Sequence, residues 1–208
     1  MLARAHLPPF GRGQRIGLFG GSFNPAHRGH VAVAEEALKS ARLDWIWWLV
    51  SPQNPLKDPR HTGDFCHRLD IARRVACHPR FRVTAFEQAI ASRMTADTLK
   101  ALRPFLAEAR FLWIMGADSL ASLHRWRHWR LLPRTLPLLV VDRPGWTFRA
   151  LNSPAAKELG AWRLKENEAP LLPDMKPPAW VFLTLPLRKE SSTAIRHATV
   201  APKSHAAS

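Results

Sequence analysis

Short, almost continuous apolar runs alternate with helical patterns along this chain. Six runs have the length of buried strands: Arg15–Phe19, Asp44–Val50, Phe81–Phe86, Ala109–Met115, Leu136–Val141 and Trp180–Leu185. Helices are predicted at His30–Ala41, at Asp64–Cys77 and from Thr95, as N-cap, to Leu102. Strands without polar alternation need cover on both faces, which a parallel sheet provides. The pattern therefore predicts a single α/β domain, a doubly wound parallel sheet flanked by helices.

Several segments lack such a pattern. Residues 152–178 have weak periodicity and are expected to form a surface excursion, and residues 51–63 a proline-rich loop. Residues 1–14 contain arginines but no acid, which favours a short basic tail over a transit peptide. We expect the domain to span residues 15–200 and residues 201–208 to form a C-terminal tail.

Composition narrows the classes of protein. The chain has 208 residues, 46% hydrophobic, and its longest apolar runs fall short of the roughly 18 residues of a membrane span. Its formal charge of +15 favours nucleic acid, phosphorylated metabolites or an acidic membrane surface without separating them, and is also compatible with an ordinary basic surface. Cys66 and Cys77 form no CxxC pair, so neither a disulfide framework nor a zinc ribbon is indicated. A reducing, cytoplasmic location is expected.

The strongest chemical signal lies between the first strand and the first helix, where residues 20–30 read GGSFNPAHRGH. Two glycines let the backbone approach a phosphate closely, and the helix start offers N–H groups and a positive dipole end. His27 and His30 are three residues apart, so both can face one anion, and Gly29 leaves the path open. The alternatives are two incidental histidines in a glycine turn or a zinc pair, which no third ligand cluster supports. The pattern is neither GxGxxG nor a Walker A loop.

A second signal follows the last strand. Residues 191–196 read SSTAIR, which places hydroxyls and N–H groups at a helix start with an arginine one turn later. Such a segment forms a phosphate clamp. Taken alone, it is more often an N-cap followed by a surface arginine.

Together the two segments resemble the nicotinate-nucleotide adenylyltransferases of the HxGH nucleotidyltransferase superfamily. The first is similar to their GGSF-D/N-P-x-H-x-G-H motif and the second to ISSTxIR, with Glu190 in place of Ile. Four further blocks resemble the family, at residues 52–57 (PQNPLK), 95–99 (TADTL, after Met94 where Tyr is usual), 115–126 (MGADSL…W) and 143–146 (RPGW). The resemblance runs from about Ile16 to Arg196 and implies a Rossmann-like fold.

The resemblance also implies a role for individual residues. The groups acting on the reacting phosphates would be His27, His30, Lys57 and Arg196. ATP would be bound by Gly20, Gly21, Ser22, Phe23, Gly29, Asp118, Ser191, Ser192 and Thr193. Nicotinate mononucleotide would be bound by Thr95, Trp126 and Arg143. Mg²⁺ would arrive with ATP, held by phosphates and water rather than by protein ligands.

The implied reaction joins ATP and nicotinate mononucleotide into nicotinate adenine dinucleotide and pyrophosphate. One alternative is a sister enzyme whose acceptor is nicotinamide mononucleotide or phosphopantetheine, but His27, Thr95 and Trp126 together favour the pyridine branch. The other is a nucleic-acid-binding module, whose basic residues should cluster with exposed aromatics. Here they are spread along the chain. We expect neither nucleic acid nor membrane as a partner, and the sequence leaves the oligomeric state open.

Overall fold

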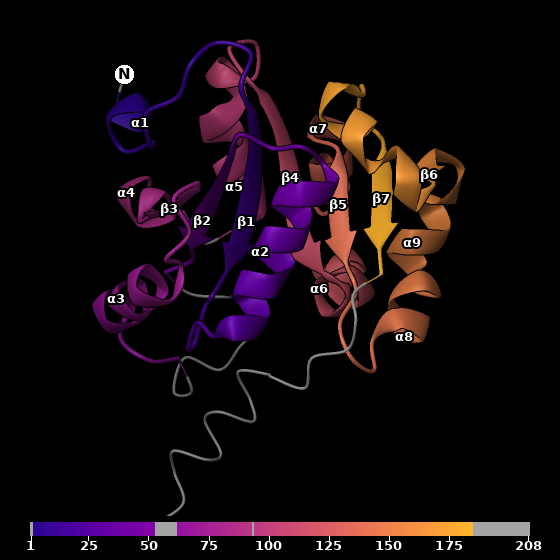
Figure 1. Ribbon diagram of the computed structural model, residues 1–208, viewed down its shortest axis with the longest axis horizontal. Coiled ribbons are helices and arrows are strands. Elements are labelled where there is room, and N and C mark those ends of the chain that lie inside the picture. The colour runs from indigo at the N-terminus through magenta and orange to yellow at the C-terminus, as the bar shows by residue number, and fades with distance from the viewer. Residues whose placement is uncertain (1, 53–61, 93, 185–208) are drawn as a thin grey trace, which may run out of the picture.

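The computed structural model describes residues 2–52, 62–92 and 94–184 (Figure 1). Within these ranges seven strands form one sheet in the order β3-β2-β1-β4-β5-β7-β6, and every neighbouring pair is parallel. The strands are β1 (Arg15–Gly21), β2 (Trp45–Val50), β3 (Phe81–Thr84), β4 (Arg110–Gly116), β5 (Leu138–Val141), β6 (Arg163–Leu164) and β7 (Trp180–Leu183). The predicted doubly wound, parallel α/β sheet is confirmed.

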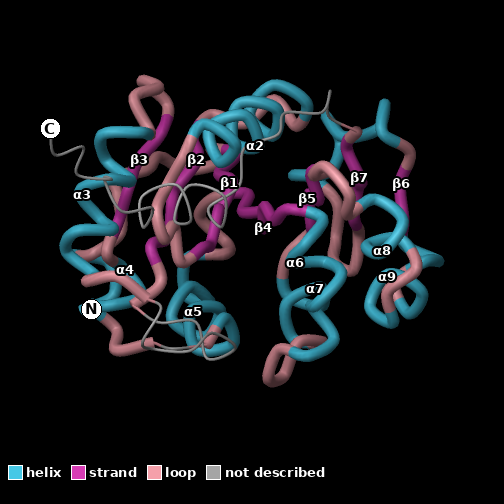
Figure 2. Tube along the Cα trace, turned by 90° about the horizontal axis from the view of Figure 1, so that it is seen from below, coloured by secondary structure: helices cyan, strands magenta, loops and turns pink. Residues whose placement is uncertain are grey.

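Helices cover both faces of the sheet (Figure 2). The α-helices are α1 (Leu2–Ala5), α2 (Arg28–Ser40), α3 (Phe65–Val75), α4 (Phe86–Ala89), α5 (Thr95–Leu102), α6 (Ala117–Ser122), α7 (Leu131–Thr135), α8 (Thr147–Leu151) and α9 (Pro154–Glu158). The 3-10 helices are η2 (Arg103–Phe105), η3 (Leu123–Arg125), η4 (Gly160–Trp162) and η5 (Glu166–Asp174). One core layer lies under α2, α3 and η5, and the other under α4 to α9.

Adjacent residues of one strand serve different layers. Trp47 belongs to the core layer that contains the α5 and α6 residues, and Trp48 to the layer under α2 and α3. Both side chains are fully buried. This two-sided burial explains why the strands show apolar runs instead of alternation.

The predicted element boundaries hold with small shifts, and one cap is wrong. The third strand ends at Thr84, whose hydroxyl accepts a hydrogen bond from the Phe86 N–H at 3.1 Å where α4 begins. Thr95 is the first residue of α5 rather than its N-cap, a position taken by Met94 without a side-chain capping bond. The end of the predicted sixth strand, Leu185, lies outside the described residues.

The expectation of a surface excursion at residues 152–178 is wrong. This segment contains α9, η4, β6 and η5, and β6 pairs with β7 at the edge of the sheet. Ala155 and Leu172 are completely buried, in opposite core layers. Its helices and its strand are short, and two of the helices are 3-10, so the sequence of this segment shows neither helical nor strand periodicity.

The N-terminal segment contributes to the core. Leu7 is buried, and the ring of Phe10 contacts those of Trp47 and Phe111 edge-on at 5.5 and 5.7 Å. The Arg4 guanidinium lies over Phe10 and pairs with Glu108 at 3.1 Å. None of the helices in the described ranges has the length and hydrophobicity needed to cross a membrane.

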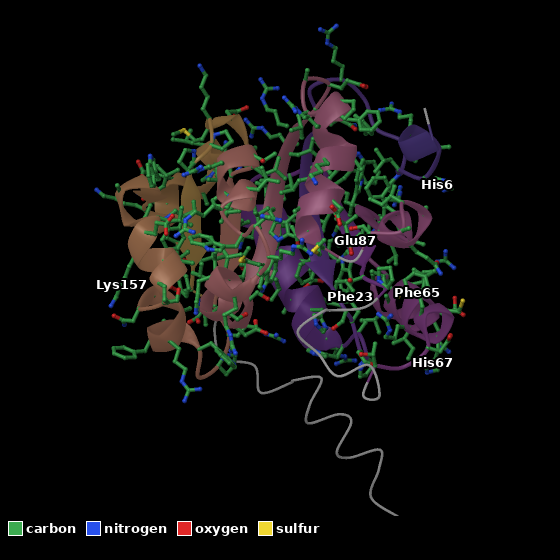
Figure 3. All side chains as sticks on the ribbon, turned by 180° about the vertical axis from the view of Figure 1, so that it is seen from behind. His6, Phe23, Phe65, His67, Glu87 and Lys157 are labelled. Carbon is green, nitrogen blue, oxygen red and sulfur yellow. The ribbon has the colours of Figure 1, made fainter. Side chains whose placement is uncertain are left out.

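A buried carboxyl group joins three elements. Glu87 of α4 is only 7% exposed, and its Oε1 accepts a hydrogen bond from the Thr98 hydroxyl of α5 at 2.8 Å. The side chain of Ser51, which follows β2, also bonds to it. Burial raises the pKa of Glu87 to about 7, against the effect of these two hydrogen bonds. Figure 3 shows Glu87 inside the molecule, away from the periphery.

We predict that Glu87→Gln changes how stability depends on pH. The unfolded chain loses the Glu87 proton near pH 4.5 and the folded chain only near 7, so this group makes the folded state less stable as pH rises between these values. The free energy of unfolding of the variant, relative to wild type, should therefore rise by up to about 3 kcal/mol from pH 4 to pH 8. Chemical denaturation of both proteins across that range measures it. Other titrating groups occur in both proteins and cancel, and parallel curves would refute the buried ionisation.

Candidate active site

The candidate site lies at the switch point of the sheet. From β1 the chain winds outward through β2 to β3, then returns to the other side of β1 as β4. Open α/β sheets bind ligands outside the carboxyl ends of the strands at such a point. The carboxyl end of β1 is Gly20-Gly21 and that of β4 is Gly116, so the glycine turn and the MGAD block meet there.

The segment from Gly20 to His30, called here the histidine turn, links β1 to α2. His27 is the N-cap of α2, and its Nδ1 accepts a hydrogen bond from the Gly29 N–H at 3.1 Å. In return, Nδ1 of His30 accepts one from the His27 N–H at 3.3 Å. The two imidazole centroids are 3.9 Å apart. This reciprocal cap brings both rings together at one helix start, and that they face one anion stays a prediction.

The capping bonds define what each imidazole can donate. Because Nδ1 accepts from a backbone N–H in both rings, a neutral imidazole carries its hydrogen on Nε2. His27 is 4% exposed, and its Nε2 is buried without a hydrogen-bond partner among the described residues. Burial, helped by the positive charge of Arg143 and opposed by Asp118, lowers the pKa of His27 to about 4. At neutral pH this ring is an uncharged donor whose N–H lacks a described partner.

Aromatic packing of Phe23 and Trp48 stabilises the histidine turn. Phe23 has a φ of 42° and is 2% exposed, with its ring stacked on Trp48 at 4.9 Å and edge-on to His30 at 5.1 Å. Figure 3 shows Phe23 beside the lower part of the sheet. Since the side chain of Phe23 is buried, only its backbone is available to a nucleotide.

Glycine at the end of β1 also has a packing reason. A Cβ added to Gly20 would lie 2.6 Å from Cζ2 of Trp113, on the neighbouring strand β4. A contact below 3 Å against a buried indole cannot be relieved by a small shift. Gly20 therefore lets β1 and β4 pack around Trp113, whatever it also permits toward a phosphate.

At the end of β4, Asp118 and Arg143 are paired with each other. Their Oδ2 and Nη1 atoms are 3.0 Å apart, and the side chains are 33% and 21% exposed. Gly116 makes room for the pair, because a Cβ there would lie 2.5 Å from Asp118 Oδ1 and 2.8 Å from Arg143 Cδ. The buried Asp142 accepts from the Arg143 N–H at 2.8 Å and from the Thr147 hydroxyl, which fixes the turn after β5.

Thr95 and Trp126 lie on other elements. Thr95 is the first residue of α5, and Trp126 follows η3, partly buried against the core. The Trp126 N–H donates to the Leu123 carbonyl at 2.9 Å. Within the described residues no hydrogen bond or ion pair joins Thr95 or Trp126 to the histidine turn.

Five expected site residues fall outside the described ranges: Lys57, Ser191, Ser192, Thr193 and Arg196. Conversely, sequence reasoning missed buried ionisable residues near the strand ends, among them Arg68 and Glu87. Neither belongs to a recognisable motif, and both occur in segments whose charge pattern resembles an ordinary helix surface.

The described groups suit one kind of ligand. They offer an uncharged imidazole N–H, the N-terminus of a 13-residue helix without acid in its first turn, and a guanidinium. All of these attract or donate to negative oxygen. The part of the chain that the structure describes has no cluster of three or more His, Cys, Asp or Glu side chains suited to holding a metal. The donors among the described residues therefore suit an anionic ligand.

Comparisons with known proteins agree with this chemistry. Residues 18–198 match the family described as cytidylyltransferase-like. A protein of Rhizobium meliloti, named probable nicotinate-nucleotide adenylyltransferase, is 47% identical over 183 residues, which are 88% of this chain and 97% of the relative. A Brucella suis protein of the same name is 48% identical over 181 residues, covering 87% and 93%.

A solved structure agrees at the level of the fold. The Plasmodium falciparum nicotinic acid mononucleotide adenylyltransferase complexed with NaAD is similar with a TM-score of 0.65 at 16% identity, covering 88% of this chain and 83% of that one. The sequence relatives carry the assignment further, because nearly half their positions are identical over almost their whole length. The chain belongs to the nicotinate-nucleotide adenylyltransferase family, within the cytidylyltransferase-like proteins.

Proposed function

We propose that the histidine turn performs the adenylyl transfer of this family, in which ATP and nicotinate mononucleotide give nicotinate adenine dinucleotide and pyrophosphate. The observation that carries the proposal is the His27 Nε2–H group, buried and without a partner in the described residues, at the N-terminus of α2. A buried donor without a partner costs free energy, which a phosphate oxygen placed there recovers.

The chemistry needs little covalent help from the protein. An oxygen of the mononucleotide 5′-phosphate forms a bond to the α-phosphorus of ATP, and the bond from that phosphorus to the bridging α–β oxygen breaks. Pyrophosphate leaves with the electron pair. Catalysis then depends on alignment and on donors aimed at the charge on the equatorial oxygens. His27 and His30 supply such donors, and because the pKa of His27 is about 4, its ring donates without changing its protonation near neutral pH.

Charged and hydroxyl groups complete the proposed site. Lys57 and Arg196 neutralise phosphate charge, and the hydroxyls of residues 191–193 seat the pyrophosphate. Gly20, Gly21, Ser22, Phe23 and Gly29 present backbone to ATP. Asp118, expected at ATP, and Arg143, expected at the mononucleotide, form one ion pair. We therefore place this pair where the two substrates meet.

Mg²⁺ is proposed to enter with ATP. The described residues hold no protein cage for it, and Asp118, whose charge acts on His27, is already paired with Arg143. This donor set fits a cation whose ligands are mainly phosphate oxygens and water. When bound, Mg²⁺ neutralises part of the triphosphate charge.

Nicotinate mononucleotide is proposed to bind between the start of α5 and Trp126. The Trp126 indole offers a face for the pyridine ring, and the first N–H groups of α5 are donors for its carboxylate. The backbone N–H of Trp126 already donates to the Leu123 carbonyl, so the donors to the carboxylate are the backbone N–H groups of Thr95 and Ala96. No acid occurs in residues 123–129, which contain Arg125 and Arg127.

Both cysteines are exposed and unpaired, in keeping with the proposed cytoplasmic location.

We predict that His27→Asn and His30→Ala each lower kcat by roughly 10²–10³, or about 2.7–4 kcal/mol, because each removes a donor to the transition state. Asparagine at residue 27 keeps an N-cap acceptor, so α2 retains its cap while Nε2–H is lost. The double variant should cost less than the sum, since both rings address one phosphate group. Steady-state pyrophosphate release measures this. His67→Ala, on the exposed face of α3, is the control and should match wild type.

We predict that Gly116→Ala raises KM for ATP. The added Cβ would occupy space held by Asp118 Oδ1 and Arg143 Cδ and so separate their ion pair. Gly160→Ala is the matched control, because nothing lies within 4 Å of a Cβ at that position. Kinetics with varied ATP at saturating mononucleotide distinguish the two variants. Equal KM values for wild type and Gly116→Ala would remove the ion pair from nucleotide binding.

The acceptor preference is predicted from the donors at α5. Amide N–H groups favour a carboxylate and leave the NH₂ of an amide facing other donors. We expect kcat/KM for nicotinate mononucleotide to exceed that for nicotinamide mononucleotide at least about tenfold, roughly 1.4 kcal/mol. Trp126→Ala should raise KM for the mononucleotide and leave that for ATP nearly unchanged. Trp162→Ala, at an exposed position, should change neither. Equal kcat/KM for both acceptors, or preference for the amide, would contradict recognition of the carboxylate by the first N–H groups of α5.

A further inference from the structure

Arg68 is buried beside the histidine turn, and its hydrogen bonds to other described residues all go to backbone carbonyls. It lies on α3 and is 1% exposed. Its Nη1 donates to the carbonyls of Ser22 at 2.5 Å and Ser51 at 2.8 Å, and its Nη2 donates to that of Pro52 at 2.7 Å. Its Nε donates to the carbonyl of Gly63 at 2.9 Å. Four donors of one planar group therefore reach three separate chain segments.

Main-chain carbonyls take the place of a salt bridge. Within the described ranges no carboxylate lies at ion-pair distance from Arg68. Burial lowers the pKa of its guanidinium, against the more distant charge of Asp64, yet an arginine keeps its proton in proteins. A buried cation without satisfied hydrogen bonds would be strongly destabilising. The arrangement therefore depends on all three segments being held where the guanidinium fork requires them.

The bonds lie just beyond the last paired residues of the sheet. Gly21 of β1 pairs with Val50 of β2, and the Ser51 N–H still donates to the Gly21 carbonyl at 2.9 Å. The carbonyls of the next residues on both strands, Ser22 and Ser51, both go to Arg68. Arg68 thus continues the strand-to-strand connection after the ladder has ended, where β1 becomes the histidine turn.

The third segment, at Gly63, connects Arg68 to the histidine turn a second time. Gly63, which accepts from Arg68, donates its own N–H to the Asn24 side chain at 3.2 Å. Asn24 lies in the histidine turn, so Arg68 is connected to that turn directly through Ser22 and indirectly through Gly63. None of these bonds involves a group that the proposed mechanism brings to the substrates' reacting atoms.

We propose that Arg68 is a positioning residue for adenylyl transfer, which holds the histidine turn at a fixed place relative to the end of β2. This role rests on the proposed function of the turn. Arg68 sets the location of His27 and His30 before ATP arrives, and loss of its fork lets the turn move. Donors that move lose transition-state stabilisation first, since alignment matters most there.

The test compares two arginine-to-lysine variants. Arg68→Lys keeps the charge but replaces the planar fork with a single nitrogen. Arg80→Lys is the control, because Arg80 donates Nη1 to the Leu43 carbonyl at 3.1 Å near the opposite, amino ends of β2 and β3. We expect Arg68→Lys to lower kcat at least about tenfold, with KM for nicotinate mononucleotide changed less than about threefold, and Arg80→Lys to match wild type. An Arg68→Lys kcat within twofold of wild type overturns the proposal.

Amide hydrogen exchange separates positioning from general stability. In Arg68→Lys, amides of residues 22–30 should exchange at least about tenfold faster, while those of β4 and α5 keep wild-type protection. Uniformly faster exchange with lower kcat means a purely structural role and overturns the proposal. A wild-type protein that forms no dinucleotide from ATP and nicotinate mononucleotide refutes the proposed function instead, whatever the exchange pattern.

If Arg68→Lys does not fold, hydrogen exchange in the wild-type protein tests the proposal instead. The Arg68 Nε–H and the amides of residues 22–30 should then exchange with one common opening free energy, because the guanidinium and the turn release together. Clearly different opening free energies for the two overturn the proposal.

Discussion

The close approach of β1 and β4 at their carboxyl ends is the constraint on which the site depends. The last paired residues of these strands are Phe19 and Ile114, and the next residue of β1, Gly20, leaves the space that the Trp113 ring fills. At the carboxyl end of β4, the missing side chain of Gly116 likewise leaves space for Asp118 and Arg143. Because both strands end in residues without side chains, the histidine turn and the MGAD block leave the sheet side by side. The site therefore begins with a packing requirement inside the sheet.

Three of the buried ionisable side chains around this edge avoid an unpaired charge in different ways. His27 is neutral because burial lowers its pKa to about 4, and Glu87 keeps its proton to about pH 7 because burial raises its pKa. Arg68 stays charged and distributes its donors over four carbonyls. Each solution also fixes geometry, since the partners are backbone groups or hydroxyls of neighbouring segments. Desolvation thus contributes to a site whose donors are oriented before substrate binds.

The net charge of +15 explains little of this by itself. Many basic side chains form local contacts far from the site, such as Arg130 with Glu158 or Arg15 and Arg110 with Asp174. At the site, the positive potential comes from a helix N-terminus without acid in its first turn and from Arg143, partly offset by Asp118. The placement of positive groups at the site, rather than the excess of basic residues in the chain, makes the site suited to phosphates.

The sequence by itself determined the parallel α/β architecture and the position of the main chemical motif. Apolar runs are visible because a strand buried on both faces allows no alternation, and residues 20–30 carry a glycine, histidine and proline pattern that is local in sequence. Only the tertiary structure decided that residues 152–178 supply a strand, that Asp118 pairs with Arg143, and that Arg68 and Glu87 are buried. The reason is physical: an arginine or glutamate on a helix has the same local pattern whether its face meets water or the carbonyls of a distant loop. Burial of such a group is fixed by contacts between segments far apart in the chain, which no local pattern records.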